Sequence, residues 1–230
     1  MHSNPERELS SGRQELIATL REKGIGEAAL KAMGRVDRIA FLPSEQRGRA
    51  YEDRALAIGL GQTCSQPWIV AVVVQALDLR PGASVLEVGA GSGYLAAVLR
   101  AAGAGNVVTV ELIPQLAVQA RRNLNRAGVS NVQVLVRDGR RGAPEHGNFD
   151  AVVVSAATRA IPSILLSQVA LPGKLIAPVI GPQGERLWCL TRGDPSWSRQ
   201  DLGECRFVPL LGDSEQTPSA VPDPPRLPLP

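Results

Sequence analysis

Short apolar runs alternate with amphipathic segments along the middle of the chain, from residue 81 to about residue 179. The apolar runs have the length of buried strands, and the segments between them place apolar residues on one helical stripe. The predicted strands are 84–88, 107–111, 132–136, 150–154 and 174–179, and the predicted helices are 93–102, 114–127 and 160–170. This alternation predicts an α/β doubly wound fold, in which helices cover both faces of a parallel sheet.

The residues before this alternation predict a small helical lead-in over residues 11–60. Ser11 and Gln14 match a capping box at the start of a first helix, and apolar positions over 27–36 predict a second helix. We expect this lead-in to cover one end of the sheet and to form a wall of any site there.

The remaining segments predict how the chain is organised as a whole. One more helix is expected at 68–79, and strand-like runs stand at 187–190 and 205–210. We therefore expect a single domain over residues 11–212, with its core at 61–212. Residues 1–10 are expected to be flexible, and the proline-rich residues 213–230 to be disordered.

A glycine-rich turn follows the predicted strand 84–88 and precedes the helix that comes next. Gly89, Gly91 and Gly93 stand at alternate positions, with Ala90 and Ser92 between them. Glycine allows positive φ and close approach of the backbone to a ligand, and the start of a helix offers free N–H groups. The turn therefore predicts a binding site for a nucleotide-like cofactor.

Polar side chains gather at the ends of the predicted strands. Glu87, Glu111, Asp138 and Ser155 stand at or just beyond four of these ends, where an open α/β sheet binds its ligand. Glu111 follows the glycine turn by about twenty positions, a spacing that suits a carboxylate bound to ribose hydroxyls. A dinucleotide fingerprint would place its third glycine at position 94, which is Tyr94. This difference favours S-adenosylmethionine over a nicotinamide cofactor.

Composition and charge limit the kinds of molecule that the chain is expected to bind. The chain of 230 residues has a net charge of +3, and 22 of its 25 basic residues are arginine. An arginine cluster over 121–141 is consistent with a solvated face or with steering of an anionic partner. Aromatic residues make up 3% of the chain, too few for the stacking surfaces that bind single-stranded nucleic acid. We expect neither a nucleic acid nor a membrane as partner, and a cytoplasmic location.

Cysteine and histidine are too few and too scattered for metal or triad chemistry. Cys64, Cys189 and Cys205 lie far apart in the sequence, and the two histidines are His2 and His146. No metal site is therefore expected, and the cysteines are interpreted as small buried hydrophobic residues.

With these motifs the chain resembles the protein-L-isoaspartate (D-aspartate) O-methyltransferase family, over about residues 16–212. The glycine turn and the acidic strand ends are common to many methyltransferases, whereas the segments upstream of residue 68 and near residue 208 are specific to this family. The matching segments are 51–59, 61–67, 85–93, 110–111, 138–139, 149–157, 171–179 and 206–210. Arg137 and Arg159 depart from the family pattern near the expected pocket mouth and could alter substrate preference.

The resemblance implies a cofactor, a substrate and a set of site residues. The cofactor is S-adenosylmethionine, and the substrate is a protein or peptide with an L-isoaspartyl side carboxylate, methylated in the repair of damaged proteins. The implied catalytic residue is Ser65. The implied substrate-binding residues are Ile58, Thr63, Ser65 and Val208, and the implied cofactor-binding residues are Glu87, Gly89, Ala90, Gly91, Ser92, Gly93, Glu111, Leu112, Asp138 and Gly139.

The chemistry of this reaction agrees with the sequence. A side carboxyl with a pKa near ~4 is already ionised at neutral pH, so its methylation needs no strong base such as histidine. A neutral donor such as Ser65 can hold the carboxylate without pairing tightly with it. The alternative interpretation of Ser65 is an N-cap for the helix that starts near Pro67.

Three other functions remain open at this point. The chain could methylate an aspartyl residue of one dedicated peptide or protein, or it could be an NAD-dependent oxidoreductase. It could also be a module that binds a cofactor or partner without catalysis. A monomer is favoured over an oligomer.

Overall fold

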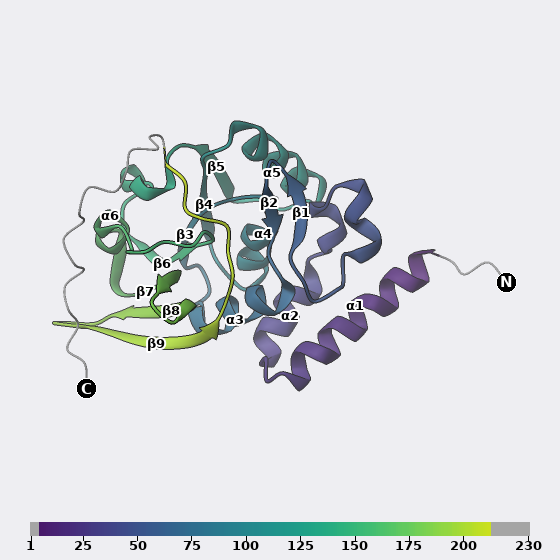
Figure 1. Cartoon of the computed structure of the whole chain (residues 1–230), viewed down its shortest axis with the longest axis horizontal. Coiled ribbons are helices and arrows are strands. Elements are labelled where there is room, and N and C mark those ends of the chain that lie inside the picture. The colour runs from purple at the N-terminus through teal and green to yellow at the C-terminus, as the bar shows by residue number, and fades with distance from the viewer. Residues whose placement is uncertain (1–4, 213–230) are drawn as a thin grey trace.

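A seven-stranded sheet runs through the centre of the molecule (Figure 1). The computed structural model describes residues 5–212, and within them the strand order is β5-β4-β3-β6-β7-β8-β9. The strands are β3 (Ser84–Val88), β4 (Asn106–Glu111), β5 (Val132–Val136), β6 (Phe149–Val154), β7 (Val169–Gly181), β8 (Gly184–Arg192) and β9 (Trp197–Glu204). The first five are parallel, and β8 and β9 continue the sheet antiparallel. The predicted doubly wound fold with a parallel sheet is confirmed.

Alternate residues of the central strands pack on opposite faces, which produces two apolar cores. Val85 and Val107 belong to the larger core, whereas their neighbours Leu86 and Val108 belong to the smaller one. Among the helices that pack on the larger core are α2 (Glu27–Arg35), α3 (Pro67–Leu77), α4 (Tyr94–Ala101) and α5 (Pro114–Arg126). The smaller core is covered by α6 (Ser163–Ser167) and by Ala143, which lies between the 3-10 helices η3 (Gly139–Arg141) and η4 (Pro144–His146). Helices thus flank both faces, although α6 is much shorter than the predicted helix 160–170.

The lead-in begins with a longer helix than the sequence predicted. Helix α1 (Pro5–Glu22) includes residues 5–10, for which a flexible terminus was expected, so the predicted helix start at Ser11 is wrong. Proline is favoured at a first helical position because its missing N–H has no acceptor there. Leu16 and Leu20 of this helix are buried in the larger core, which fixes the lead-in to the rest of the fold.

Two 3-10 helices and a hairpin complete the lead-in, and the sequence did not predict the hairpin. Helices η1 (Arg38–Phe41) and η2 (Ser44–Arg49) lead to β1 (Leu56–Gly59), which pairs antiparallel with β2 (Gln62–Cys64). Gly59, Leu60 and Gly61 all have positive φ, which produces the tight reversal between the strands. In Figure 1 this hairpin is drawn near the middle of the view, between the strands of the sheet and α1.

The segment after β9 crosses the carboxyl ends of the strands as an irregular extended chain, drawn in yellow in Figure 1. The strand predicted at 205–210 is therefore wrong, because the segment forms an isolated bridge between Pro209 and Ala157 rather than a continuous ladder. Ala157 donates to the carbonyl of Val208, and Leu210 donates back to the carbonyl of Ala157, both at 2.8 Å. The predicted disordered tail at 213–230 and residues 1–4 lie outside the described residues.

Candidate active site

A cavity of about 800 Å³, its open mouth included, lies at the carboxyl ends of β3, β4 and β6. It is bounded by the β1–β2 hairpin, the glycine turn and the extended segment 205–212. Most of the predicted site residues line it: Thr63, Ser65, Glu87, Gly89, Ala90, Gly91, Ser92, Glu111, Leu112, Gly139 and Val208. The structure therefore brings the residues implied for cofactor and for substrate to one cavity. Ile58, Gly93 and Asp138 are not among its lining residues.

The glycine turn exposes backbone toward the cavity. Gly89 has φ of 97° and Gly91 has φ of 51°, conformations that L side chains rarely adopt. A Cβ at Gly91 would lie 3.4 Å from Cδ1 of Ile58, so Ile58 packs against the turn from the hairpin. Gly93 caps α4 at its N-terminus and supports the turn behind the cavity.

The Glu111 carboxylate ties the end of β4 to the glycine turn. One oxygen accepts the N–H of Gly91 at 2.8 Å, and the other accepts the N–H of Ile113 at 3.0 Å. The side chain is buried, and bonds from N–H donors to a carboxylate are stronger than neutral ones. Each carboxylate oxygen can accept a second bond, so Glu111 can still bind the hydroxyls of a ligand.

The Glu87 carboxyl is buried beneath the cavity with an unsatisfied oxygen. Its Oε2 has no hydrogen-bond partner among residues 5–212, and the residue is 1% exposed. Burial raises the pKa of Glu87 from its ordinary value to about 8, and the nearby charge of Glu111 adds to the rise. A buried acceptor that lacks a partner in a cavity wall is suited to a donor on a bound ligand.

Ser65 lies between β2 and α3, half-buried in the cavity wall. The N-cap of α3 is Gln66 and makes no side-chain cap bond, so the interpretation of Ser65 as the N-cap is wrong. Asp53 caps this helix instead, because its carboxylate accepts the N–H of Trp68 at 2.9 Å. The Ser65 hydroxyl is therefore not required for capping, and Thr63 lines the same wall.

Asp138 lies just behind the cavity rather than in its wall. Its carboxylate accepts the N–H of Arg140 at 2.9 Å, and the Arg140 guanidinium pairs with it at 2.6 Å. Asp138 is thus the N-cap of η3, and the first residue of that helix, Gly139, lines the cavity. The expected bond between Asp138 and an adenine amino group stays a prediction.

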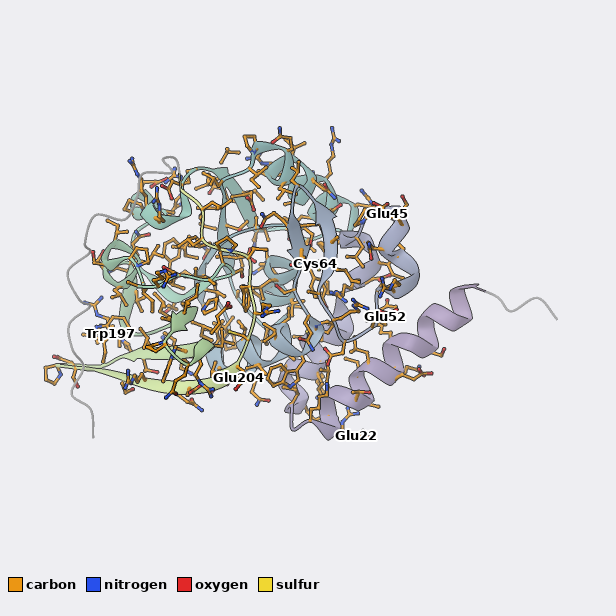
Figure 2. All side chains as sticks on the ribbon, in the orientation of Figure 1. Glu22, Glu45, Glu52, Cys64, Trp197 and Glu204 are labelled. Atoms are coloured by element: carbon orange, nitrogen blue, oxygen red, sulfur yellow. The ribbon has the colours of Figure 1, made fainter. Side chains whose placement is uncertain are left out.

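Several lining residues were not predicted. Ile113 and Ala156 stand two residues beyond predicted strand ends, and that position was the signal that could have found them. The other lining residues that were missed are Gln62, Cys64, Val70, Val88, Tyr94, Leu95, Val110, Leu116, Pro209, Leu210 and Leu211. Cys64 is buried, whereas Glu22 and Glu204, also labelled in Figure 2, are exposed.

The two arginines that depart from the family pattern do not line the cavity. Arg137 pairs with Glu145 at 2.5 Å and bonds to the carbonyl of Gly142. Arg159 is exposed. Within residues 5–212, no group of three acidic, histidine or cysteine side chains could hold a metal ion. No helix in the same range is long and apolar enough to cross a membrane.

Comparisons with known proteins agree with this geometry. Residues 11–215 match the family model described as protein-L-isoaspartate(D-aspartate) O-methyltransferase. The chain is 49% identical over 201 residues to the protein-L-isoaspartate O-methyltransferase of Xanthomonas euvesicatoria, covering 86% of this chain and 88% of that protein. It is 44% identical over 211 residues to protein-L-isoaspartate O-methyltransferase 2 of Marinobacter nauticus, covering 90% and 95%.

Solved structures show the same fold. A protein-L-isoaspartate O-methyltransferase superposes with a TM-score of 0.79 at 30% identity, covering 87% of this chain and 66% of that chain. A putative protein-L-isoaspartate O-methyltransferase from Plasmodium falciparum, in complex with S-adenosyl-L-homocysteine, superposes with a TM-score of 0.74 at 25% identity. That match covers 86% of this chain and 98% of the other.

Proposed function

Since the chain belongs to the protein-L-isoaspartate(D-aspartate) O-methyltransferase family, we propose that its cavity transfers a methyl group from S-adenosylmethionine to an L-isoaspartyl side carboxylate. The observation that carries the proposal is the meeting of two groups of residues in one cavity. The glycine turn and Glu111 form one wall, and Thr63 and Ser65 form another. Methyl transfer requires cofactor and substrate to meet in this way.

The residues present fit S-adenosylmethionine. The backbone at Gly89 and Gly91 has no side chain that would fill the turn, and Glu87 has a buried oxygen without a partner. We assign the methionine and ribose end of the cofactor to Glu87, Gly89, Ala90, Gly91, Ser92 and Gly93. The ribose hydroxyls are assigned to Glu111, and the adenine to Leu112, Asp138 and Gly139. The missing third glycine and the methyltransferase relatives both disfavour the NAD-dependent alternative.

Methyl transfer to a carboxylate needs no general base, because the substrate carboxyl is ionised at neutral pH. When bound, S-adenosylmethionine supplies an electrophilic methyl group that the carboxylate takes up as an ester. The Ser65 hydroxyl donates to the carboxylate and holds it toward the cofactor wall, with Thr63 beside it. Ile58 and Val208 flank the substrate. Correct alignment of two reactants can supply about 7–11 kcal/mol of a reaction barrier.

The substrate is a protein or peptide that carries isoaspartate. By its resemblance to the family, the methyl ester closes spontaneously to a succinimide, and hydrolysis then returns part of it as normal aspartate. The activity is therefore repair of damaged proteins. We further propose that the enzyme works as a monomer in the cytoplasm, without a nucleic acid or membrane partner. The low aromatic content of 3% supports the absence of a single-stranded nucleic acid partner.

Peptide methylation by the wild type and Ser65→Ala tests the proposal. The substrates are an isoaspartyl peptide and the matching aspartyl peptide, and calorimetry with S-adenosylhomocysteine measures cofactor-site affinity. We expect the wild type to methylate the isoaspartyl peptide, and Ser65→Ala to lose about 100-fold in turnover with unchanged affinity. Activity on the aspartyl peptide alone would instead favour a dedicated aspartyl substrate. Inactivity on both peptides, with the ligand bound, would refute the repair function.

A further inference from the structure

Arg38 is a positively charged residue buried in the interior of the lead-in. It is not among the residues that line the cavity. The residue is 1% exposed, and it pairs with no carboxylate among residues 5–212. A buried ion costs several kcal/mol of desolvation unless its hydrogen bonds are satisfied. Burial of this guanidinium therefore has a free-energy cost, and the contacts of Arg38 indicate what the side chain does.

The Arg38 guanidinium binds five backbone carbonyls from two separate segments. Three belong to the loop that precedes β1, and two belong to the end of β2 and the residue after it. The acceptors are Ala50 at 2.8 Å, Glu52 at 3.3 Å, Arg54 at 3.0 Å, Cys64 at 3.3 Å and Ser65 at 2.8 Å. Glu52 and Cys64, labelled in Figure 2, mark the two segments that this one side chain joins.

One of these carbonyls belongs to the residue assigned to the substrate. Ser65 follows β2 and precedes α3, so no strand or helix hydrogen bond fixes its carbonyl. The bond from Arg38 holds this carbonyl on the interior side of the segment. We propose that Arg38 is a positioning residue for methyl transfer, because it fixes the backbone from which the Ser65 hydroxyl reaches the substrate carboxylate. This inference rests on the proposed role of Ser65.

A second contact links Arg38 to the first residue of α4. The guanidinium carbon lies 5.8 Å from the centre of the Tyr94 ring, within the range of a cation–π interaction. Tyr94 is the first residue of α4, directly after Gly93, and it lines the cavity. Arg38 thus contacts the substrate segment and the helix that follows the glycine turn. Arginine suits this position because Nη1 and Nη2 of its planar fork offer four N–H donors to the carbonyls, whereas lysine offers three. The remaining donor, the buried Nε–H, has no hydrogen-bond partner among residues 5–212.

Variants of the full chain test the proposal. Arg38→Met removes all the donors, Arg38→Lys keeps the charge and some donors, and Leu20→Ala creates a cavity in the same lead-in without touching the five carbonyls. We measure kcat and KM for the isoaspartyl peptide well below each variant's melting temperature, and the affinity for S-adenosylhomocysteine by calorimetry. Backbone amide hydrogen exchange is measured over residues 62–66.

Arg38→Met is expected to lose about 100-fold in kcat/KM for the peptide, as a displacement of a reacting group by about 1 Å would cause. Its affinity for S-adenosylhomocysteine should stay unchanged, and exchange over 62–66 should accelerate. Arg38→Lys should recover part of the activity, and Leu20→Ala should retain it. If Arg38→Met does not fold, Arg38→Lys provides the test instead. We expect it to lose part of the peptide activity while its affinity for S-adenosylhomocysteine stays unchanged.

Two results would overturn the proposal. One is an unchanged rate of amide hydrogen exchange over residues 62–66 in the Arg38 variants. This measurement does not depend on activity, so it tests the proposal even if the wild type fails to methylate the peptide. The other is a loss of peptide activity in Leu20→Ala that equals the loss in Arg38→Met, which would mean that lower stability alone explains the effect. Failure of the proposed function is distinct, because it appears in the wild type.

Discussion

Glu87→Gln should remove a pH dependence of stability that originates beneath the cavity. The substitution keeps the shape of the side chain and deletes its only titrating group. Burial raises the pKa of Glu87 from 4.5 to about 8, so the folded protein binds a proton that the unfolded chain releases between these values. The free energy of unfolding contributed by this carboxyl therefore falls as the pH rises through that window.

The magnitude follows from the size of the pKa shift. Each pH unit inside the window removes about 1.4 kcal/mol of stability, so the change from pH 5.5 to pH 7.5 is about 3 kcal/mol. Below pH 4.5 the effect is absent, because the carboxyl is protonated in both states, and above pH 8 it is complete. The glutamine variant lacks this contribution at every pH.

Urea unfolding of the wild type and Glu87→Gln at pH 5.5, 6.5 and 7.5 measures the difference. We expect the stability of the variant relative to the wild type to rise by about 1.4 kcal/mol per pH unit. Glu15→Gln, which removes an exposed carboxyl, controls for the loss of one negative charge. Parallel pH profiles for the wild type and Glu87→Gln would show that Glu87 is ionised in the fold, and the account of its burial would then be wrong.

Two further substitutions test the cavity wall. Glu111→Ala removes the acceptor of the Gly91 and Ile113 N–H groups, and it should weaken S-adenosylhomocysteine binding about 10- to 100-fold in calorimetry; unchanged affinity would contradict the ribose assignment. Gly139→Ala would place a Cβ 2.4 Å from Cγ1 of Val88, so thermal unfolding should show a loss of about 1–3 kcal/mol; an unchanged melting temperature would mean that the wall shifts freely.

The cofactor side of the site could be predicted from the sequence because it is encoded locally. The run 84–88 ends in the glycine turn, and the structure has β3 with these bounds. Glu111 ends β4, and its carboxylate meets the turn through one hydrogen bond to Gly91. Parallel pairing of β3 with β4 brings two segments some twenty residues apart to the same edge, which is the consequence that the alternating pattern predicts.

The substrate side could not be predicted in the same way because its order depends on distant contacts. Strands β1 and β2 are four and three residues long, too short for a periodic signal, and the turn between them carries two glycines that also suit an irregular loop. The helix α3 is capped by Asp53, fourteen positions before its first residue, rather than by a neighbouring serine. Local capping rules therefore assigned Ser65 the wrong role.

Arg38 shows how much of the site was invisible to sequence patterns. Charged residues are almost never fully buried unless they are paired. From the sequence alone, the side chain of Arg38, between Asp37 and Ile39, is therefore expected to be exposed. Its acceptors follow it by 12 to 27 residues and are all carbonyls, which carry no residue-specific signal. The wall proposed for the cofactor thus consists of residues that motifs in the sequence identify, whereas the wall proposed for the substrate is bonded to an arginine that no motif identifies. Loss of that arginine should impair peptide methylation while the cofactor motifs stay intact, so those motifs alone are not sufficient evidence of activity in a related chain.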